Sequence, residues 1–113
     1  MSLELETEDP RTLEFKARVF KVLGDSNRIK IMEFLRGGER CQCEVIPILD
    51  QSQPTVSRHL RLLEEAGLIT SRKDGNRTFY RVADERAFNI LDSLDYELMR
   101  VLSHGLISKL IVA

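Results

Sequence analysis

The sequence predicts a single, mainly α-helical domain that carries one small β-hairpin. Its 113 residues fit one domain. Over most of the chain, apolar residues recur every three or four positions, which is the helical period. Within residues 68–82 the period changes to two, and Asp74-Gly75, a favoured dipeptide of tight hairpin turns, separates two extended runs. We expect the domain over residues 10–113, behind a flexible acidic tail, residues 1–9.

The first helix is expected to begin at Pro10, directly after the capping residue Asp9, and to end at Leu23. Its apolar residues form two stripes, and a helix with two apolar stripes usually packs against two surfaces. We expect its own core on one side and a partner subunit on the other. The stripes consist of Leu13, Ala17 and Phe20, and of Phe15, Val19 and Val22.

Residues 24–26 are expected to end the first helix and cap the second, which stops at the two glycines of residues 37–38. The apolar residues of the second helix are Ile29, Ile31, Met32 and Leu35. A short third helix is expected from about Cys43 to Asp50. Because proline is tolerated in the first turn of a helix, Pro47 should prevent a start much before residue 43.

The fourth helix is expected to begin after the cap Ser52, with Pro54 in its first turn, and to run to Ala66. Its buried stripe is Val56, Leu60 and Leu63. The hairpin strands follow at residues 68–72 and 78–82.

One long last helix is expected over residues 84–112. Its apolar seam is Leu91, Leu94, Leu98, Val101 and Leu102. The helix ends in Ile107, Leu110, Ile111 and Val112, which are too apolar to face water on a monomer and again predict a partner subunit.

A polar helix that follows a tight turn and precedes a hairpin is the plan of a winged helix-turn-helix domain. The fourth helix suits a DNA major groove, because glutamine can pair with adenine and arginine with guanine. Basic residues of the hairpin can contact phosphates. The candidate DNA-binding residues are Gln53, Thr55, Ser57, Arg58, His59 and Arg61 on the helix, and Arg72, Lys73, Asn76, Arg77 and Tyr80 on the hairpin. A merely solvated polar face is the alternative, as is a packing role for His59.

The charge distribution agrees with a nucleic-acid partner. The net charge is -1. Residues 54–81 are nevertheless net positive, whereas residues 1–14 and 82–113 are net negative. Nucleic-acid binding requires one positive face and not a positive protein.

Composition and motifs exclude several classes of function. The longest uninterrupted apolar run, residues 110–113, is far shorter than the roughly twenty residues of a membrane span. No apolar signal segment, phosphate-binding loop or catalytic constellation is visible. We expect a cytoplasmic protein that is not an enzyme and has no membrane partner. A winged-helix module that binds other proteins instead of DNA is the alternative.

Several motifs occur together in a characteristic order. They are LGDSNRIKIM from Leu23, CQCE from Cys41, DQSQPTVSRHL from Asp50, LLEEAGLI from Leu62, RKDGNR from Arg72 and FYRV from Phe79. Over roughly residues 13–103, the chain closely resembles the ArsR/SmtB family of bacterial and archaeal repressors.

The resemblance implies a homodimer that is built on the first and last helices. It binds double-stranded operator DNA in two major grooves about one helical turn apart, needs no cofactor for this, and is released by an inducer. The interface residues expected from the apolar pattern and the resemblance are Phe15, Val19, Val22, Leu91, Leu94, Leu98, Val101 and Leu102.

Cys41 and Cys43 are the candidate metal-binding residues, because thiolates suit soft ions and metalloids. The chain resembles the arsenic-responsive branch, whose sensor is Cys-x-Cys-x-x-Cys, although Ile46 stands at the third position. Side chains two residues apart on a regular helix point about 200° apart. Both sulfurs can therefore share one ion only if Cys41 precedes the helix.

Three interpretations of this pair stay open. It senses trivalent arsenic or antimony as the inducer, with a third ligand from elsewhere. Alternatively, it is a thiol redox switch, or it has no effector. The family's zinc site on the last helix is not expected, because the positions that would join His104 are Leu91, Ser93 and Ile107.

Overall fold

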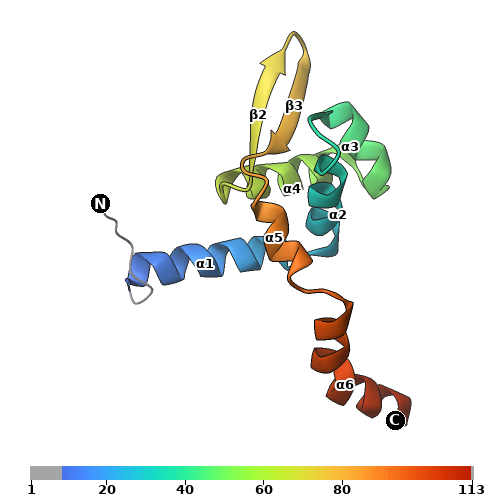
Figure 1. The fold of residues 1–113 in the computed structure, drawn as a ribbon. Coiled ribbons are helices and arrows are strands. Elements are labelled where there is room, and N and C mark those ends of the chain that lie inside the picture. The colour runs from blue at the N-terminus through green and yellow to red at the C-terminus, as the bar shows by residue number, and fades with distance from the viewer. Residues whose placement is uncertain (1–8, 113) are drawn as a thin grey trace.

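The computed structural model describes the backbone of residues 9–112 and the side chains of residues 9–106 (Figure 1). It contains helices and a small sheet in the order α1 (Pro10–Leu23), α2 (Ser26–Leu35), β1 (Arg40–Cys41), α3 (Gln42–Leu49), α4 (Gln53–Glu65), β2 (Ile69–Asp74), β3 (Arg77–Val82), α5 (Ala87–Asp92) and α6 (Tyr96–Val112). The predicted tail lies outside the described residues, apart from Asp9.

The first, second and fourth helices begin at the capping residues that the sequence predicts. The Asp9 carboxylate accepts a 2.8 Å hydrogen bond from the backbone N–H of Arg11. The Asp25 carboxylate accepts from the backbone N–H of Asn27 at 2.9 Å. Ser52 caps α4. Each cap satisfies N–H groups that have no partner inside the helix, which is why these boundaries are encoded locally.

The sheet has three antiparallel strands in the order β1-β3-β2. The predicted hairpin is confirmed, but its two loop residues are Gly75 and Asn76, one position later than expected. Gly75 has a φ of 64°, which glycine adopts without steric cost. The strand β1 was not predicted, because two residues are too few for a periodic pattern.

A single core lies between α2, α3, α4 and the sheet. The residues without solvent exposure include Ile31, Met32, Val45, Val56, Leu60 and Leu63. The predicted stripe of α4 is thereby confirmed. Of the apolar residues of α2, Ile29 differs from the buried Ile31, Met32 and Leu35, because it is 37% exposed and lines an apolar groove described below.

Helix α3 begins at Gln42, so Pro47 lies in its second turn and not in its first as predicted. The start is set by Cys41 and Glu44. The Cys41 N–H donates to the Glu44 carboxylate at 2.8 Å, and the Cys43 N–H donates to the Cys41 sulfur at 3.1 Å. This reciprocal cap stabilises the helix start, and a proline so near the end of a short helix removes only one backbone hydrogen bond.

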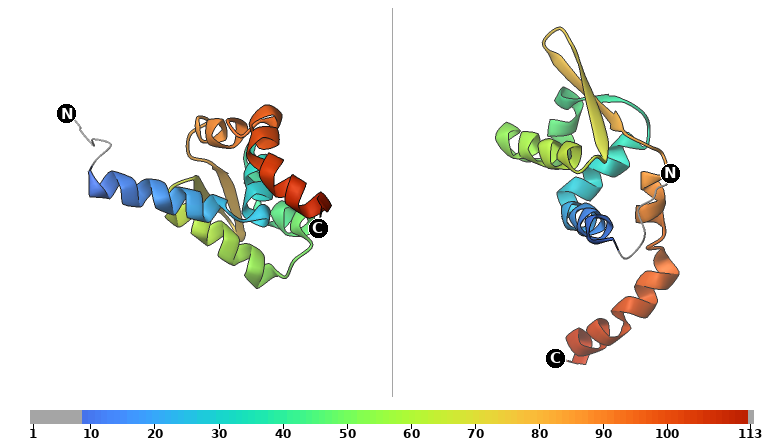
Figure 2. Two further views of the ribbon diagram at one scale, coloured as in Figure 1. Left: turned by 90° about the horizontal axis from the view of Figure 1, so that it is seen from below. Right: turned by 90° about the vertical axis from the view of Figure 1, so that its left-hand side faces the viewer.

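The single long last helix was a wrong prediction, because the chain breaks between α5 and α6. The Ser93 hydroxyl donates to the carbonyl of Ile90 at 2.8 Å where α5 ends, and the Asp95 carboxylate accepts from the Leu98 N–H at 2.9 Å where α6 begins. These local bonds compete with a continuous helix. The two helices consequently point in different directions (Figures 1 and 2).

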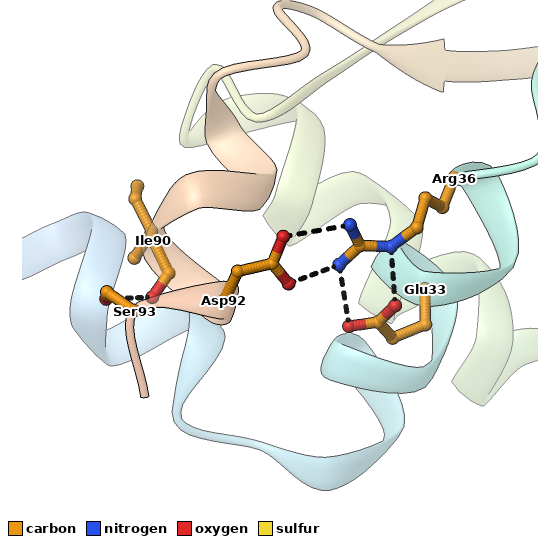
Figure 3. A network of polar contacts seen from close by, with 5 residues as sticks. All are labelled: Glu33, Arg36, Ile90, Asp92 and Ser93. Carbon is orange, nitrogen blue, oxygen red and sulfur yellow. Dashed lines mark hydrogen bonds and ion pairs between the residues drawn. The ribbon is translucent and has the colours of Figure 1, made fainter. Parts of the chain in front are cut away.

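Helix α5 is held against α2 by Arg36. Its guanidinium donates to both oxygens of Asp92, at 3.0 and 2.8 Å, and to Glu33 of its own helix (Figure 3). It also lies 4.4 Å above the ring of Phe88. By contrast, α1 and α6 project away from the packed body, and the hairpin points away from α6 (Figures 1 and 2).

Candidate nucleic-acid interface

Helix α4 presents a polar surface opposite its buried stripe. Gln53 and Thr55 are exposed in its first turn, and Arg58 and Arg61 are exposed further along. Recognition helices contact base edges mainly through their N-terminal residues. In the right-hand view of Figure 2, α4 and the hairpin project toward the same side.

Ser57 is turned toward α3 instead of solvent. Its hydroxyl accepts a 2.8 Å hydrogen bond from the side-chain amide of Gln42. The other side-chain atom of Gln42, its Oε1, accepts a long 3.5 Å bond from the Tyr80 hydroxyl. Gln42 thus connects α3 to both α4 and β3.

His59 does not lie on the outward face, so this part of the prediction is wrong. The side chain is only 6% exposed, and its Nδ1 lies 3.2 Å from a guanidinium nitrogen of Arg28. With 100° per residue, position 59 lies on the flank of the stripe that Val56 and Leu63 define. A helical projection of the sequence would therefore have favoured the packing role.

The His59 environment opposes a positive charge. Burial lowers the pKa of His59, the guanidinium groups of Arg28 and Arg58 lower it further, and the Asp25 carboxylate raises it. With Arg28 as donor, Nδ1 is the hydrogen-bond acceptor of a neutral ring.

The tip of the hairpin is basic and exposed. Lys73, Asn76 and Arg77 all face solvent there. Arg72, by contrast, donates to both oxygens of Glu39 at 2.9 and 2.8 Å and lies over the ring of Phe79. Its charge is therefore partly compensated within the protein.

Tyr80 is the second predicted DNA contact that the structure corrects. Its side chain is 9% exposed and belongs to the core. Side chains alternate along a strand, and β3 directs Tyr80 and Val82 inward and Arg81 outward. Burial raises the pKa of Tyr80, with a smaller contribution from Glu64.

The cations of α4 and the hairpin tip differ from the other arginines of the molecule in their ion pairing. Away from it, Arg11, Arg36, Arg86 and Arg100 each pair with a carboxylate. Within the described side chains, none of the ion pairs involves Arg58, Arg61, Lys73 or Arg77. Unneutralised positive charge thus collects beside the polar start of α4.

The cysteine pair lies next to the same surface. Cys41 precedes α3, its Cα lies 5.1 Å from that of Cys43, and the two sulfurs are joined as a disulfide. The expectation that the chain brings both sulfurs together is confirmed. Cys41 is 4% exposed, whereas Cys43 faces solvent.

A small cleft of about 200 Å³ connects the pair to the candidate DNA-binding elements. Its lining includes Cys41, Cys43, Ile46, Gln53, Asn76 and Arg77. No group of three or more His, Cys, Asp or Glu side chains is close enough to hold a metal ion in the described part of the chain. Cys41 and Cys43 are the sulfur-bearing residues of the cleft lining.

The predicted dimer residues fall into two sets. Val19 and Val22, each 8% exposed, pack in the core of this chain, and Leu91 packs partly against it. Other apolar residues on α1, near the α5–α6 break and on α6 are strongly exposed: Leu13, Phe15, Phe20, Leu94, Leu98, Val101 and Leu102. A groove of about 580 Å³ lies between the end of α1, the helices α2 and α5, and the start of α6. Its lining includes Phe20, Ile29, Ile90, Leu94 and Leu98.

None of the described helices is long and apolar enough to cross a membrane.

Comparison with known proteins agrees with this architecture. Residues 25–71 match the family model described as bacterial regulatory protein, arsR family. An uncharacterized HTH-type transcriptional regulator of Methanocaldococcus jannaschii is 39% identical over 73% of this chain and 93% of its own length. An arsenical resistance operon repressor of Staphylococcus aureus is 36% identical over 68% of this chain and 74% of its own length.

A solved structure gives the same fold. It is the NMR structure of a homodimeric winged helix-turn-helix DNA-binding domain from Mycobacterium bovis, described as a possible ArsR-family regulator. The TM-score is 0.74 at 26% identity, with 91% of this chain and 95% of that one covered. Taken with the helix order, the three-stranded sheet and the sequence matches, this likeness establishes that the chain belongs to the ArsR family of bacterial regulatory proteins, a family of winged-helix regulators and not of enzymes.

Proposed function

We propose that the chain is a homodimeric transcriptional repressor, which binds operator DNA through α4 and the hairpin and releases it when an inducer binds Cys41 and Cys43. The observation that carries this proposal is the exposed surface of Gln53, Thr55 and the unpaired cations, which lies beside the cysteine pair. A repressor acts where the chromosome lies. In a prokaryote this is the cytoplasm, which also keeps thiols reduced.

The chemistry of α4 supports binding in a major groove. Gln53 and Thr55 provide an amide and a hydroxyl with a methyl group, which can contact adenine and thymine. Arg58 and Arg61 can contact guanine or phosphate. The hairpin residues Lys73 and Arg77 suit the phosphate backbone, where they add affinity with little sequence information.

The exposed apolar residues support a dimer. Phe15, Phe20, Leu98, Val101 and Leu102 would leave a large apolar surface in water on a single chain. A two-fold dimer through α1 and α6 covers it and gives the protein two recognition helices, which fit a near-palindromic operator.

The cysteine pair supports trivalent arsenic or antimony as the inducer. Two thiolates at a helix start are soft donors, and the Cys43 N–H, which donates to the Cys41 sulfur, favours the thiolate form there. Ile46 stands at the position of the third cysteine of the arsenic-responsive motif and lines the same cleft. Its side chain has no donor atom, so the third ligand comes from solution.

The route from the pair to the DNA surface is short. Cys41 is also a residue of β1, where it pairs with Phe79 of β3, and its neighbour Gln42 is bonded to Ser57 of α4. A ligand that moves the start of α3 therefore acts on the hairpin and on the recognition helix together.

The joined sulfurs favour a second candidate, a redox-controlled repressor with the same DNA surface. In that case oxidation of the Cys41 and Cys43 thiols to the disulfide changes the DNA affinity, and a thiol reductant restores it.

The test is fluorescence anisotropy of the reduced protein on its own upstream DNA, with Cys41→Ser/Cys43→Ser as the control. Release by arsenite from the wild type alone supports the metalloid sensor. Release by diamide, reversed by dithiothreitol, supports the redox switch. A protein that binds no duplex at any salt concentration would instead be an interaction module.

A further inference from the structure

An open cleft of about 880 Å³ lies beside the recognition helix, on the flank away from the hairpin. It is formed by the second half of α1, the start of α2 and the outer side of α4. The helices α1 and α4 lie side by side there, as the left-hand view of Figure 2 shows. Its charged lining residues are Arg18, Lys21, Asp25, Arg28, Arg58 and Glu65.

Cations outnumber carboxylates among the described residues that line this cleft. Arg18 and Lys21 lie one turn apart on α1 and are exposed, and no ion pair of the described side chains involves either of them or Arg58. The Asp25 carboxylate caps α2 by accepting from the N–H groups of Asn27 and Arg28. With Glu65 it makes two carboxylates in the lining, against the four cations Arg18, Lys21, Arg28 and Arg58. The cleft therefore keeps a net positive charge.

Arg28 forms the fixed floor of the cleft. Its Nε donates to the carbonyl of Val22 at 2.5 Å, and a terminal nitrogen contacts His59 at 3.2 Å. These bonds hold a positive charge in one place in the cleft that the exposed side chains of Arg18 and Lys21 also line. A preorganised charge of this kind suits an anion.

The position of the cleft identifies which anion. A helix in a major groove lies between two phosphate backbones. One flank of α4 adjoins α3 and the sheet, through Gln42–Ser57 at 2.8 Å and Ser71–Glu64 at 2.7 Å. The hairpin continues on that flank toward one backbone. The opposite flank carries Arg58 and opens into the cleft.

We propose that this cleft binds a backbone phosphate of the operator on the side of the groove opposite the hairpin, with Arg18 and Lys21 as the contacting cations. The inference rests on the proposed DNA-binding function and extends the interface to α1. A phosphate contact of this kind positions the recognition helix and adds affinity without sequence information.

The test compares Arg18→Gln/Lys21→Gln with a control that loses the same charge elsewhere. Lys16→Gln/Lys30→Gln is suitable because both lysines are exposed and lie outside the cleft, and Lys16 is about 200° around α1 from Arg18. Anisotropy titrations of operator and scrambled duplexes at several salt concentrations give the slope of log K against log salt.

The cleft variant should lose affinity for both duplexes alike. Its salt slope should become shallower by about 0.9 for each protomer bound, because the variant loses one phosphate contact and each such contact contributes about 0.9 to the slope. The control should keep the wild-type slope. Equal losses in the two variants would mean that only net charge matters and would overturn the proposal.

Two further outcomes are informative. If the wild type binds no duplex, the proposed function itself fails. If the wild type binds DNA and pyrophosphate at constant ionic strength releases it, while the cleft variant keeps the wild-type salt slope and ignores pyrophosphate, then the cleft holds a small anion and not a DNA phosphate. That result would overturn the DNA contact while leaving the repressor intact.

Discussion

Gln42 and Ser57 join the helix that follows the cysteine pair to the helix that faces DNA, through a single hydrogen bond of 2.8 Å. Gln42 directly follows Cys41, and Ser57 lies in the same stretch of α4 as Arg58. Gln42 therefore gives a shift at the cysteines a direct route to the recognition helix.

Gln42→Ala should weaken the coupling between inducer and DNA and leave DNA binding itself largely intact. Allosteric coupling free energies are about 1–3 kcal/mol, and we expect the variant to lose a measurable part of that value. The measurement is the ratio of operator Kd with and without arsenite. Gln51→Ala, an exposed glutamine outside α3 and α4, is the matched control. An unchanged ratio in Gln42→Ala would place the coupling in the β1–β3 pairing instead.

His59 should make the protein less stable as the pH falls. Burial lowers its pKa in the folded state below the value of about 6.5 that an exposed histidine has. The unfolded chain then binds a proton at a higher pH than the folded one. The free energy of unfolding is therefore not reduced by His59 above about pH 6.5, and it declines below that pH. Chemical unfolding of the wild type and His59→Gln between pH 7.5 and about 5.5 measures this. Parallel curves for the two proteins would show that other groups cause the decline.

Arg58→Ala should reduce specificity for the operator. If the guanidinium pairs with a guanine, its loss costs about 1–3 kcal/mol on the operator and much less on a scrambled duplex. Competition titrations with both duplexes give the ratio. A ratio equal to that of the wild type would assign Arg58 to the phosphate cleft alone.

Arg77→Ala should weaken binding to all DNA sequences by the same factor. Its place at the hairpin tip, exposed and without an ion pair in the described part of the chain, suits a phosphate contact. The salt slope should become shallower by about 0.9 for each protomer. Arg72→Ala is a useful comparison, because Arg72 is bonded to Glu39 and should have less effect on the slope. A loss confined to the operator would contradict the phosphate assignment.

Leu98→Glu should separate the subunits. Leu98 lines the apolar groove between α1 and α6 and is 41% exposed in a single chain, so a charge there would be buried in the proposed dimer without a partner. Sedimentation should detect monomer at concentrations where the wild type is dimeric. Arg100→Gln, on the same helix and paired with nearby Glu97, should leave the dimer unchanged. An intact Leu98→Glu dimer would exclude this groove from the interface.

The sequence by itself determined the features that depend on neighbouring residues. Asp9, Asp25 and Ser52 mark helix starts because each cap bonds to an N–H two or three residues away. The hairpin follows from a glycine between two alternating runs. The α4 stripe follows from the helical period, and a stricter use of that period would also have placed His59 inside.

Only the tertiary structure decided the features that join distant segments. The cleft at Cys41 and Cys43 includes Asn76 and Arg77, and the positive cleft joins Arg18 to Arg58 across α1 and α4. The contact of Arg28 with His59 likewise depends on how α2 packs against α4. Such contacts depend on how helices and strands pack in three dimensions, and the local propensities that set helix and turn boundaries carry no information about that packing.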